Sequence, residues 1–217
     1  MVCSVGFDLD LTLADTRAGI AAVYDEVASR LGVPIDSAEV VSRLGPPLEQ
    51  ELAVWLPEED VPAAAALYRS LYAEIAVPRT TLMAGAAEAV AAVRRHGGRV
   101  IVVTGKNGVS ARETVDFLRL DVDEVVGSVF GAAKGVAIQQ FGAAAYVGDH
   151  VADIAAARAG GALSVTVTTG AYPSEAMHAH GADVILRDLT EFASWFSVWC
   201  VPEIGAVSTV IRRPGRA

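Results

Sequence analysis

Two aspartates, Asp8 and Asp10, close the first apolar run of the chain, residues 5–7. Side chains two residues apart in a strand point to the same face, so both carboxylates would project together from the strand's C-terminal end, where open α/β sheets place their ligands. Such a pair needs a partner that offsets its repulsion, and the usual one is a divalent metal coordinated by oxygen. An aspartate near a metal stays ionised and can act as a nucleophile, while its neighbour transfers protons. A solvated turn, with Thr12 and Asp15 as turn or cap formers, explains the motif equally well.

A second candidate group follows the β-branched run at residues 100–103. The Thr104 hydroxyl and the Gly105 backbone N–H could both contact one phosphate oxygen. Thr-Gly after a strand is also ordinary turn chemistry. Lys106, one of the chain's two lysines, either reaches the same site or faces water.

The other lysine, Lys134, stands at the start of a predicted helix after Gly131. A helix N-terminus attracts anions, and an ammonium there adds a point charge for a phosphate. Because a lysine in the first turn opposes the helix dipole, we expect an anion or a carboxylate to face it. The alternative is an exposed lysine.

A further pair of carboxylates, Asp149 and Asp153, follows the apolar run that ends at Gly148. Asp149 either caps the next helix or is a metal ligand, with Asp153 one helical turn later as a further or outer ligand. Magnesium-type sites prefer oxygen, so His150 between them is expected to face the substrate or solvent.

The elements that would position these groups alternate between helix and strand from about residue 84 onward. This alternation predicts an α/β fold, a parallel sheet with helices on both faces. Besides the first run, strands are expected at 100–103, 125–130, 145–148, 163–167 and 183–186.

Residues 16–78 have helical spacing and little strand character, with apolar residues three and four positions apart up to Leu31, around Leu48 to Leu56, and from Leu67 to Ile75. The sequence therefore predicts a helical insertion at 16–78 within a core domain of residues 1–15 and 79–200. Residues 201–217 are expected to be an irregular tail.

The order Asp8-x-Asp10-x-Thr12, Thr104, Lys134 and Gly148-Asp149-x-x-x-Asp153 resembles the haloacid-dehalogenase-like superfamily of phosphohydrolases, whose core is a Rossmann-like sheet. The insertion resembles the small helical cap of phosphoglycolate-phosphatase-like members, and Gly45-Pro46-Pro47-Leu48 is similar to a Gly-x-Pro-Leu loop of such caps. The chain departs from the family at two positions: Leu11, where glycine is frequent, and His150, where a small hydroxyl residue is common.

The resemblance implies that Asp8 attacks phosphorus to form an aspartyl-phosphate and that Asp10 protonates the leaving oxygen and then activates water. It implies Mg²⁺ as cofactor, held by Asp8, the backbone carbonyl of Asp10, Asp149 and, further out, Asp153. It implies phosphate binding by Thr104, Gly105 and Lys134. Contacts to the leaving group would come from Arg43, Gly45, Lys106 and Arg17.

The expected function is thus a Mg-dependent phosphatase acting on a small soluble phosphate monoester; phosphoglycolate, a nucleotide and a sugar phosphate fit, as does pyrophosphate. A phosphoglucomutase-like transfer keeps the same motifs and remains an alternative. A phospho-accepting receiver module and a non-catalytic Mg-binding or interaction protein are further alternatives.

Composition limits the partners. The chain is 53% hydrophobic and 20% charged, which is globular, and its net charge of −9 argues against a nucleic-acid-binding surface. The apolar stretch 195–211 contains Pro202 and Glu203 and is too short to span a bilayer.

The two cysteines, Cys3 and Cys200, do not have the spacing of a metal site, and we expect both to be reduced thiols, which indicates a cytoplasmic protein. The expected partner is a small phosphorylated metabolite, and the protein is expected to be a monomer or homodimer.

Overall fold

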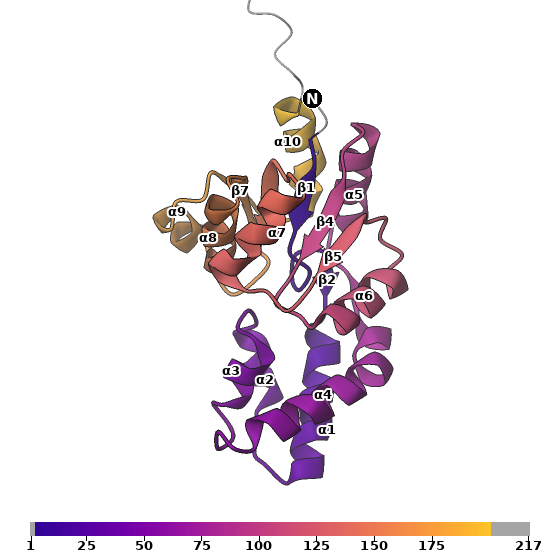
Figure 1. The fold of residues 1–217 in the computed structure, drawn as a ribbon, viewed down its shortest axis with the longest axis vertical. Helices are drawn as coiled ribbons and strands as arrows, with labels where there is room; N and C mark the ends of the chain where they lie inside the picture. Colours follow the sequence, from indigo (N-terminus) through magenta and orange to yellow (C-terminus); the bar gives the residue numbers. More distant parts are fainter. Residues whose placement is uncertain (1–2, 201–217) are drawn as a thin grey trace, which may run out of the picture.

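The computed structural model describes residues 3–200; the predicted tail at 201–217 lies outside the described residues. Two lobes are visible in Figure 1, an α/β core above and a helical lobe below. We call the helical lobe, formed by helices α1–α4, the cap.

The core is a six-stranded parallel sheet in the order β5-β4-β1-β6-β7-β8. The predicted parallel sheet with helices around it is confirmed. The strands are β1 (Val5–Phe7), β4 (Val100–Val103), β5 (Glu124–Val126), β6 (Ala145–Gly148), β7 (Leu163–Val167) and β8 (Val184–Leu186).

Side chains of the strands alternate between two cores. Val100 and Val102 pack with α5 (Ala86–Arg95) and α10 (Phe192–Trp199), whereas Ile101 and Val103 pack with α7 (Lys134–Gln140) and α8 (Val151–Ala159). This period of two on a sheet buried on both faces explains why the run is continuously β-branched. Helices α6 (Gly108–Phe117) and α9 (Ser174–Ala179) are the remaining helices around the sheet.

Strand β5 is shorter than predicted. The apolar run was expected to continue to residue 130, but β5 ends at Val126. Gly127 then passes so close to Gly108 that an added Cβ would lie 2.4 Å from the Gly108 Cα, and Ser128 takes a left-handed φ of 62°. The chain turns here, and Ser128 is placed beside the end of β4 rather than in a strand.

The cap consists of α1 (Arg17–Leu31), α2 (Ser37–Ser42), α3 (Leu48–Leu52) and α4 (Val61–Ile75) around a separate apolar core. Val23, Val27 and Leu52 are fully buried in it. The predicted helix around Leu48–Leu56 is shorter in the structure, because α3 ends at Leu52 and turns follow.

A two-stranded antiparallel ribbon joins the lobes. It pairs β2 (Ala14–Asp15) with β3 (Thr81–Leu82), the two chain segments that connect the core to the cap. The sequence did not predict this ribbon. Its strands are two residues long, too short to show a period.

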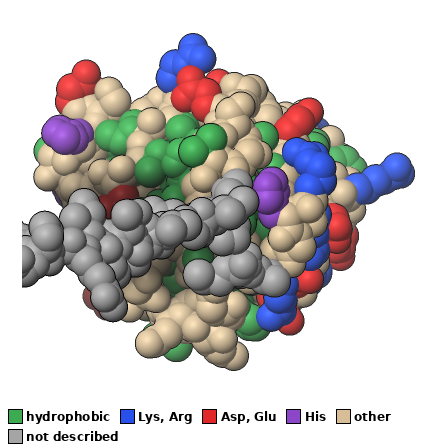
Figure 2. All heavy atoms as spheres, turned by 90° about the horizontal axis from the view of Figure 1, so that it is seen from above, with side chains coloured by type: hydrophobic (Ala, Val, Ile, Leu, Met, Phe, Trp, Pro, Cys, Tyr) green, Lys and Arg blue, Asp and Glu red, His purple; other side chains and the backbone are tan. Residues whose placement is uncertain are grey.

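The face of the core opposite the cap is seen in Figure 2, where basic and acidic side chains are interspersed. At this end the Cys3 Sγ lies 3.9 Å from the backbone oxygen of Cys200. No helix within residues 3–200 is both long and apolar enough to cross a membrane.

Candidate active site

The site lies at the carboxyl edge of three neighbouring strands. In the register of the sheet, Phe7 of β1 pairs with Val102 of β4 and Val147 of β6. The backbone N–H of Asp8 donates to the carbonyl of Val147 at 2.8 Å, so Asp8 is still held against β6 just after β1 ends. Asp8 is one residue beyond this register on β1, and Thr104 and Asp149 are two residues beyond it on β4 and β6, so the three side chains meet at the same edge.

Three carboxylates converge at this edge. One oxygen from each of Asp8, Asp149 and Asp153 lies within 4.8 Å of the others, and Asp8 Oδ1 is buried without a hydrogen-bond partner. Burial raises the pKa of Asp8 to about 6 against the pull of Lys134, and burial with the neighbouring carboxylates raises that of Asp149. An all-oxygen set with an unsatisfied buried acceptor suits a hard cation such as Mg²⁺.

Lys134 is the cation of this cluster. It is 2% exposed, and its Nζ lies 2.7 Å from Asp153 Oδ1 and 3.1 Å from Asp8 Oδ1, the latter outside hydrogen-bond geometry. Burial would lower the pKa of Lys134, but Asp153 and Asp8 outweigh it and hold the pKa above its usual range. Carboxylates therefore face the lysine at the start of α7.

Tyr146 supports Lys134 from β6 and was not singled out in the sequence. Its hydroxyl accepts from Lys134 Nζ at 2.9 Å and donates to the carbonyl of Val103 at 2.6 Å. A tyrosine inside an apolar strand looks like an ordinary core residue, so no signal in the sequence identified it.

The turn after β6 depends on a glycine. A Cβ on Gly148 would lie 2.2 Å from Asp153 Oδ2, so only glycine lets this carboxylate fold back over the strand end. There Asp153 Oδ2 accepts from the backbone N–H of His150 at 3.2 Å. His150, not Asp149, caps α8, because its Nδ1 accepts from the N–H of Ala152 at 2.9 Å.

Asp10 is held apart from the three-carboxylate cluster. Thr16 Oγ1 donates to Asp10 Oδ1 at 2.6 Å, and Lys106 Nζ lies 3.0 Å from the same oxygen. Lys106 Nζ also donates to the Tyr72 hydroxyl of the cap at 2.7 Å. Lys106 therefore faces the site, not water, and links Asp10 to the cap; the roles of Thr16 and Tyr72 in this link were not predicted.

Leu11 occupies a position where the resembling family often has glycine, and its backbone shows why. Its φ of 57° is left-handed, a conformation that costs a non-glycine residue about 1–2 kcal/mol. Two bonds hold it there: its N–H donates to the carbonyl of Ala14, and its carbonyl accepts from Thr169. The turn carries Thr12 to Asp149, where the hydroxyl donates to Oδ1 at 3.0 Å.

The cap arginines are engaged within the cap or at its base. Arg43 lines the site, but its guanidinium pairs with Glu51 and Glu39. Arg17 forms an exposed pair with Asp15. Since Arg17 is not among the residues that line the site, the expectation that it reaches the leaving group gains no support from its position.

Gly45 brings the cap into contact with the core. It has a φ of 146°, and an added Cβ would lie 2.6 Å from the His150 ring. The loop at residues 44–47 therefore rests directly on His150.

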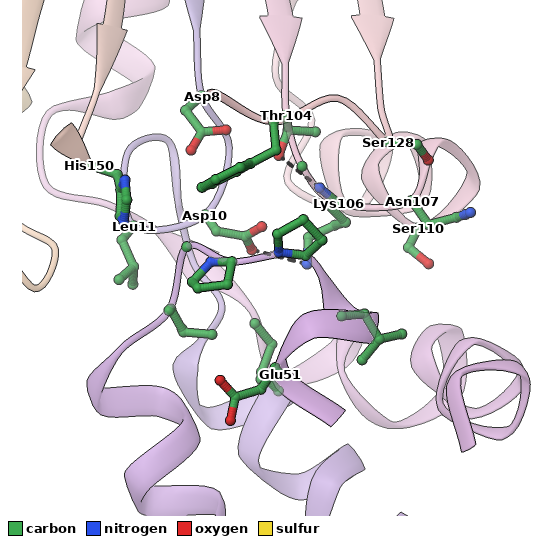
Figure 3. Close-up of a pocket in the computed structure, with 18 of the residues that line it drawn as sticks. Asp8, Asp10, Leu11, Glu51, Thr104, Lys106, Asn107, Ser110, Ser128 and His150 are labelled. Carbon is green, nitrogen blue, oxygen red and sulfur yellow. Dashed lines mark hydrogen bonds and ion pairs between the residues drawn. The ribbon is translucent and has the colours of Figure 1, made fainter. Parts of the chain in front are cut away.

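These groups surround a cavity of about 270 Å³ between the lobes. Figure 3 shows Asp8 and Thr104 at the strand ends, Asp10 and Lys106 in the middle, and Glu51 coming from the cap. Gly105, Arg43 and Gly45 also line it, so the structure brings all the predicted site residues except Arg17 to one place.

Comparisons with known proteins agree with this arrangement. A probable phosphatase, IndB, of Dickeya dadantii is 28% identical over 205 residues, which cover 85% of this chain and 89% of that protein. A haloacid dehalogenase-like family hydrolase from Streptococcus pneumoniae superposes with a TM-score of 0.79 at 24% identity, over 90% of this chain and 98% of that one. A predicted phosphoglycolate phosphatase from Haemophilus somnus gives 0.76 at 21%, over 88% and 96%.

The sequence model of the haloacid dehalogenase-like hydrolases matches residues 4–161, which contain the cap and every carboxylate and lysine of the site. The chain belongs to the haloacid dehalogenase-like hydrolase family.

Proposed function

We propose that the protein is a Mg-dependent phosphatase that hydrolyses small phosphate monoesters through a phosphorylated Asp8. The observation that carries the proposal is the cavity edge where Asp8 meets the buried Lys134, Thr104 and two further carboxylates. A nucleophile, a positive charge and hydrogen-bond donors for a phosphate group lie together there, and phosphoryl transfer needs all three.

Asp8, Asp149 and Asp153 fit a divalent cation by their all-oxygen donor set and the unsatisfied Asp8 Oδ1. Asp8, the backbone carbonyl of Asp10 and Asp149 would hold Mg²⁺, with Asp153 further out. When bound, the ion would neutralise the phosphate dianion and the repulsion among the carboxylates.

In the proposed reaction, the Asp8 carboxylate attacks phosphorus, and the bond to the ester oxygen breaks. Asp10 gives its proton to that oxygen, then takes one from the water that hydrolyses the aspartyl-phosphate. The Thr104 hydroxyl, the Gly105 N–H and the Lys134 ammonium would carry the phosphate charge. The separation of Asp10 from the carboxylate cluster supports its different role.

The cap is proposed to exclude water and to select the leaving group. The small cavity favours metabolites over protein substrates. The names of the similar proteins, a probable phosphatase and a predicted phosphoglycolate phosphatase, support phosphate-ester hydrolysis.

The test is release of inorganic phosphate from a panel of small esters, with Mg²⁺ and with a chelator, for the wild type and Asp8→Asn. We expect Mg-dependent release that the variant loses. Release that Asp8→Asn retains would refute the assignment of Asp8. Isomerisation of a sugar phosphate without net phosphate release would favour the mutase alternative.

A further inference from the structure

The cations that line the cavity on the cap side are already neutralised. Arg43 donates to both carboxylate oxygens of Glu51, at 2.8 and 3.0 Å, and also pairs with Glu39. Arg69 pairs with Glu49 in the same wall. No lining arginine of the described residues is therefore left to receive a second anion.

Glu51 holds Arg43 through a buried carboxylate. Its side chain is 8% exposed, and besides Arg43 it accepts a hydrogen bond from Trp55 Nε1 at 2.9 Å. The Arg43 guanidinium also lies 5.7 Å from the centre of the Trp55 ring. A substrate anion that drew Arg43 away would leave the Glu51 carboxylate buried without its cation, which is unfavourable.

The cations on the core side of the cavity are also paired with carboxylates. Lys134 faces Asp8 and Asp153, and Lys106 faces Asp10. In all, the described lining contains four Lys or Arg side chains and six Asp or Glu side chains. One Mg²⁺ would offset this excess of negative charge, and the transferred phosphate would bring it back. A second anionic group on the substrate would then enter an already negative cavity.

The remaining polar groups of the cavity are uncharged. Figure 3 shows Asn107, Ser110 and Ser128 along one side. Asn107 Oδ1 caps α6 by accepting from the N–H of Val109, so the side-chain N–H groups of Asn107 point away from that cap. Within residues 3–200, neither serine hydroxyl forms a hydrogen bond with another side chain or with the backbone. Such groups hydrogen-bond to hydroxyls and carbonyls without needing a countercharge.

We propose that the site selects phosphate monoesters whose leaving group is uncharged and rejects those that carry a second anionic group. The inference rests on the proposed phosphatase function and narrows it. Esters of polyols, sugars or nucleosides fit, whereas a carboxylate-bearing ester, a bisphosphate or pyrophosphate does not. Phosphoglycolate is therefore a poor substrate for this chain.

The experiment compares kcat/KM within pairs in which a carboxylate replaces a hydroxymethyl group: glucitol 6-phosphate against 6-phosphogluconate, and 2-hydroxyethyl phosphate against 2-phosphoglycolate. We expect kcat/KM to be at least about tenfold higher for the member of each pair whose leaving group carries no carboxylate. Equal or reversed values, with clear turnover, would overturn the inference and leave the phosphatase function standing. No turnover of any ester would refute the phosphatase function, and the inference with it.

A matched pair of variants tests the cause. Glu51→Gln removes the buried countercharge of Arg43 and should raise kcat/KM for 6-phosphogluconate relative to glucitol 6-phosphate by about threefold or more. Glu39→Gln removes the exposed partner of the same arginine and should leave that ratio nearly unchanged, because Glu51 remains. Circular dichroism checks that Glu51→Gln is folded. If it is folded and its ratio of the two kcat/KM values equals that of Glu39→Gln, the hold of Glu51 on Arg43 does not determine the selectivity, and the argument is wrong.

Discussion

The Asp8 carboxyl combines burial with like charges, and this determines how it ionises. Its pKa is raised to about 6, first by burial, with Lys134 pulling it down and Asp153 and Asp10 pushing it up. An ordinary carboxyl, as in the unfolded chain, has a pKa of 3.8. In metal-free protein near neutral pH, the folded state therefore holds a charge that it disfavours.

This shift predicts a pH-dependent stability of the metal-free protein. A group whose pKa is raised on folding contributes most below its unfolded pKa, and that contribution is lost as the pH rises through the folded value. In chelator, Asp8→Asn should therefore be more stable than the wild type at pH 7.5 by at most about 3 kcal/mol, with the difference fading below about pH 4.

Urea unfolding followed by circular dichroism measures this difference, and Mg²⁺ provides the control. The ion should stabilise the wild type more than Asp8→Asn, because the variant lacks one of its proposed ligands. Equal stability of the two proteins at every pH in chelator would show that the Asp8 charge is not disfavoured in the fold.

At the level of elements, the loop at residues 44–47 is one place where the cap touches the core at the cavity. Gly45 has a positive φ and lies against the His150 ring. Gly45→Ala adds both backbone strain and a clash, about 1–3 kcal/mol for the strain alone. We expect kcat/KM to fall about tenfold, since the loop must move away from the site.

Gly32→Ala is the matched control for this prediction. Gly32 ends α1 with a φ of 66°, and its added Cβ would meet nothing within 4 Å. It should lower the melting temperature but leave kcat/KM near the wild-type value. A Gly45→Ala enzyme that is no slower than Gly32→Ala would show that the loop contact is unimportant for turnover.

The elements differ in how far the sequence predicts them. The run at Val100–Val103 is β-branched throughout and was correctly predicted as a strand, and the helix expected after Asp149 is α8, which begins at Val151. Helix α9 was missed, because six residues with one buried side chain, Met177, show no period. Lys134 signalled a partner by opposing the helix dipole, but the Arg43–Glu51 pair depends on how α2 and α3 meet, which no local pattern contains.

For the whole molecule, the decisive contact is the one between lobes at Lys106. Its ammonium touches the core carboxylate Asp10 and the cap hydroxyl of Tyr72, and the Tyr72 ring lies 4.4 Å away from it. Burial would lower the pKa of Lys106, but Asp10 and Tyr72 raise it above its ordinary value. The lysine therefore stays charged and ties the position of the cap to the proposed acid.

Removal of the Tyr72 hydroxyl should weaken this tie. A hydrogen bond to a charged group contributes about 1.5–3 kcal/mol, so Tyr72→Phe should lower kcat/KM by about tenfold or more while the ring keeps its packing. Tyr24→Phe is the comparison, because within residues 3–200 the Tyr24 hydroxyl makes no hydrogen bond. Steady-state kinetics measure the effect. Equal losses of kcat/KM in the two variants would show that the hydrogen bond between Lys106 and Tyr72 is unimportant for turnover.

The central claim is that Asp8 accepts the phosphoryl group, and trapping that species tests it most directly. Acetyl phosphate has a leaving group that needs no proton, so Asp10→Asn should form the phosphoenzyme yet lack the base that hydrolyses it. Intact-mass spectrometry after mixing with Mg²⁺ should show one phosphoryl group per chain, and peptide mapping should place it on Asp8. A label on another residue, or no label while the wild type turns over acetyl phosphate, would contradict the account.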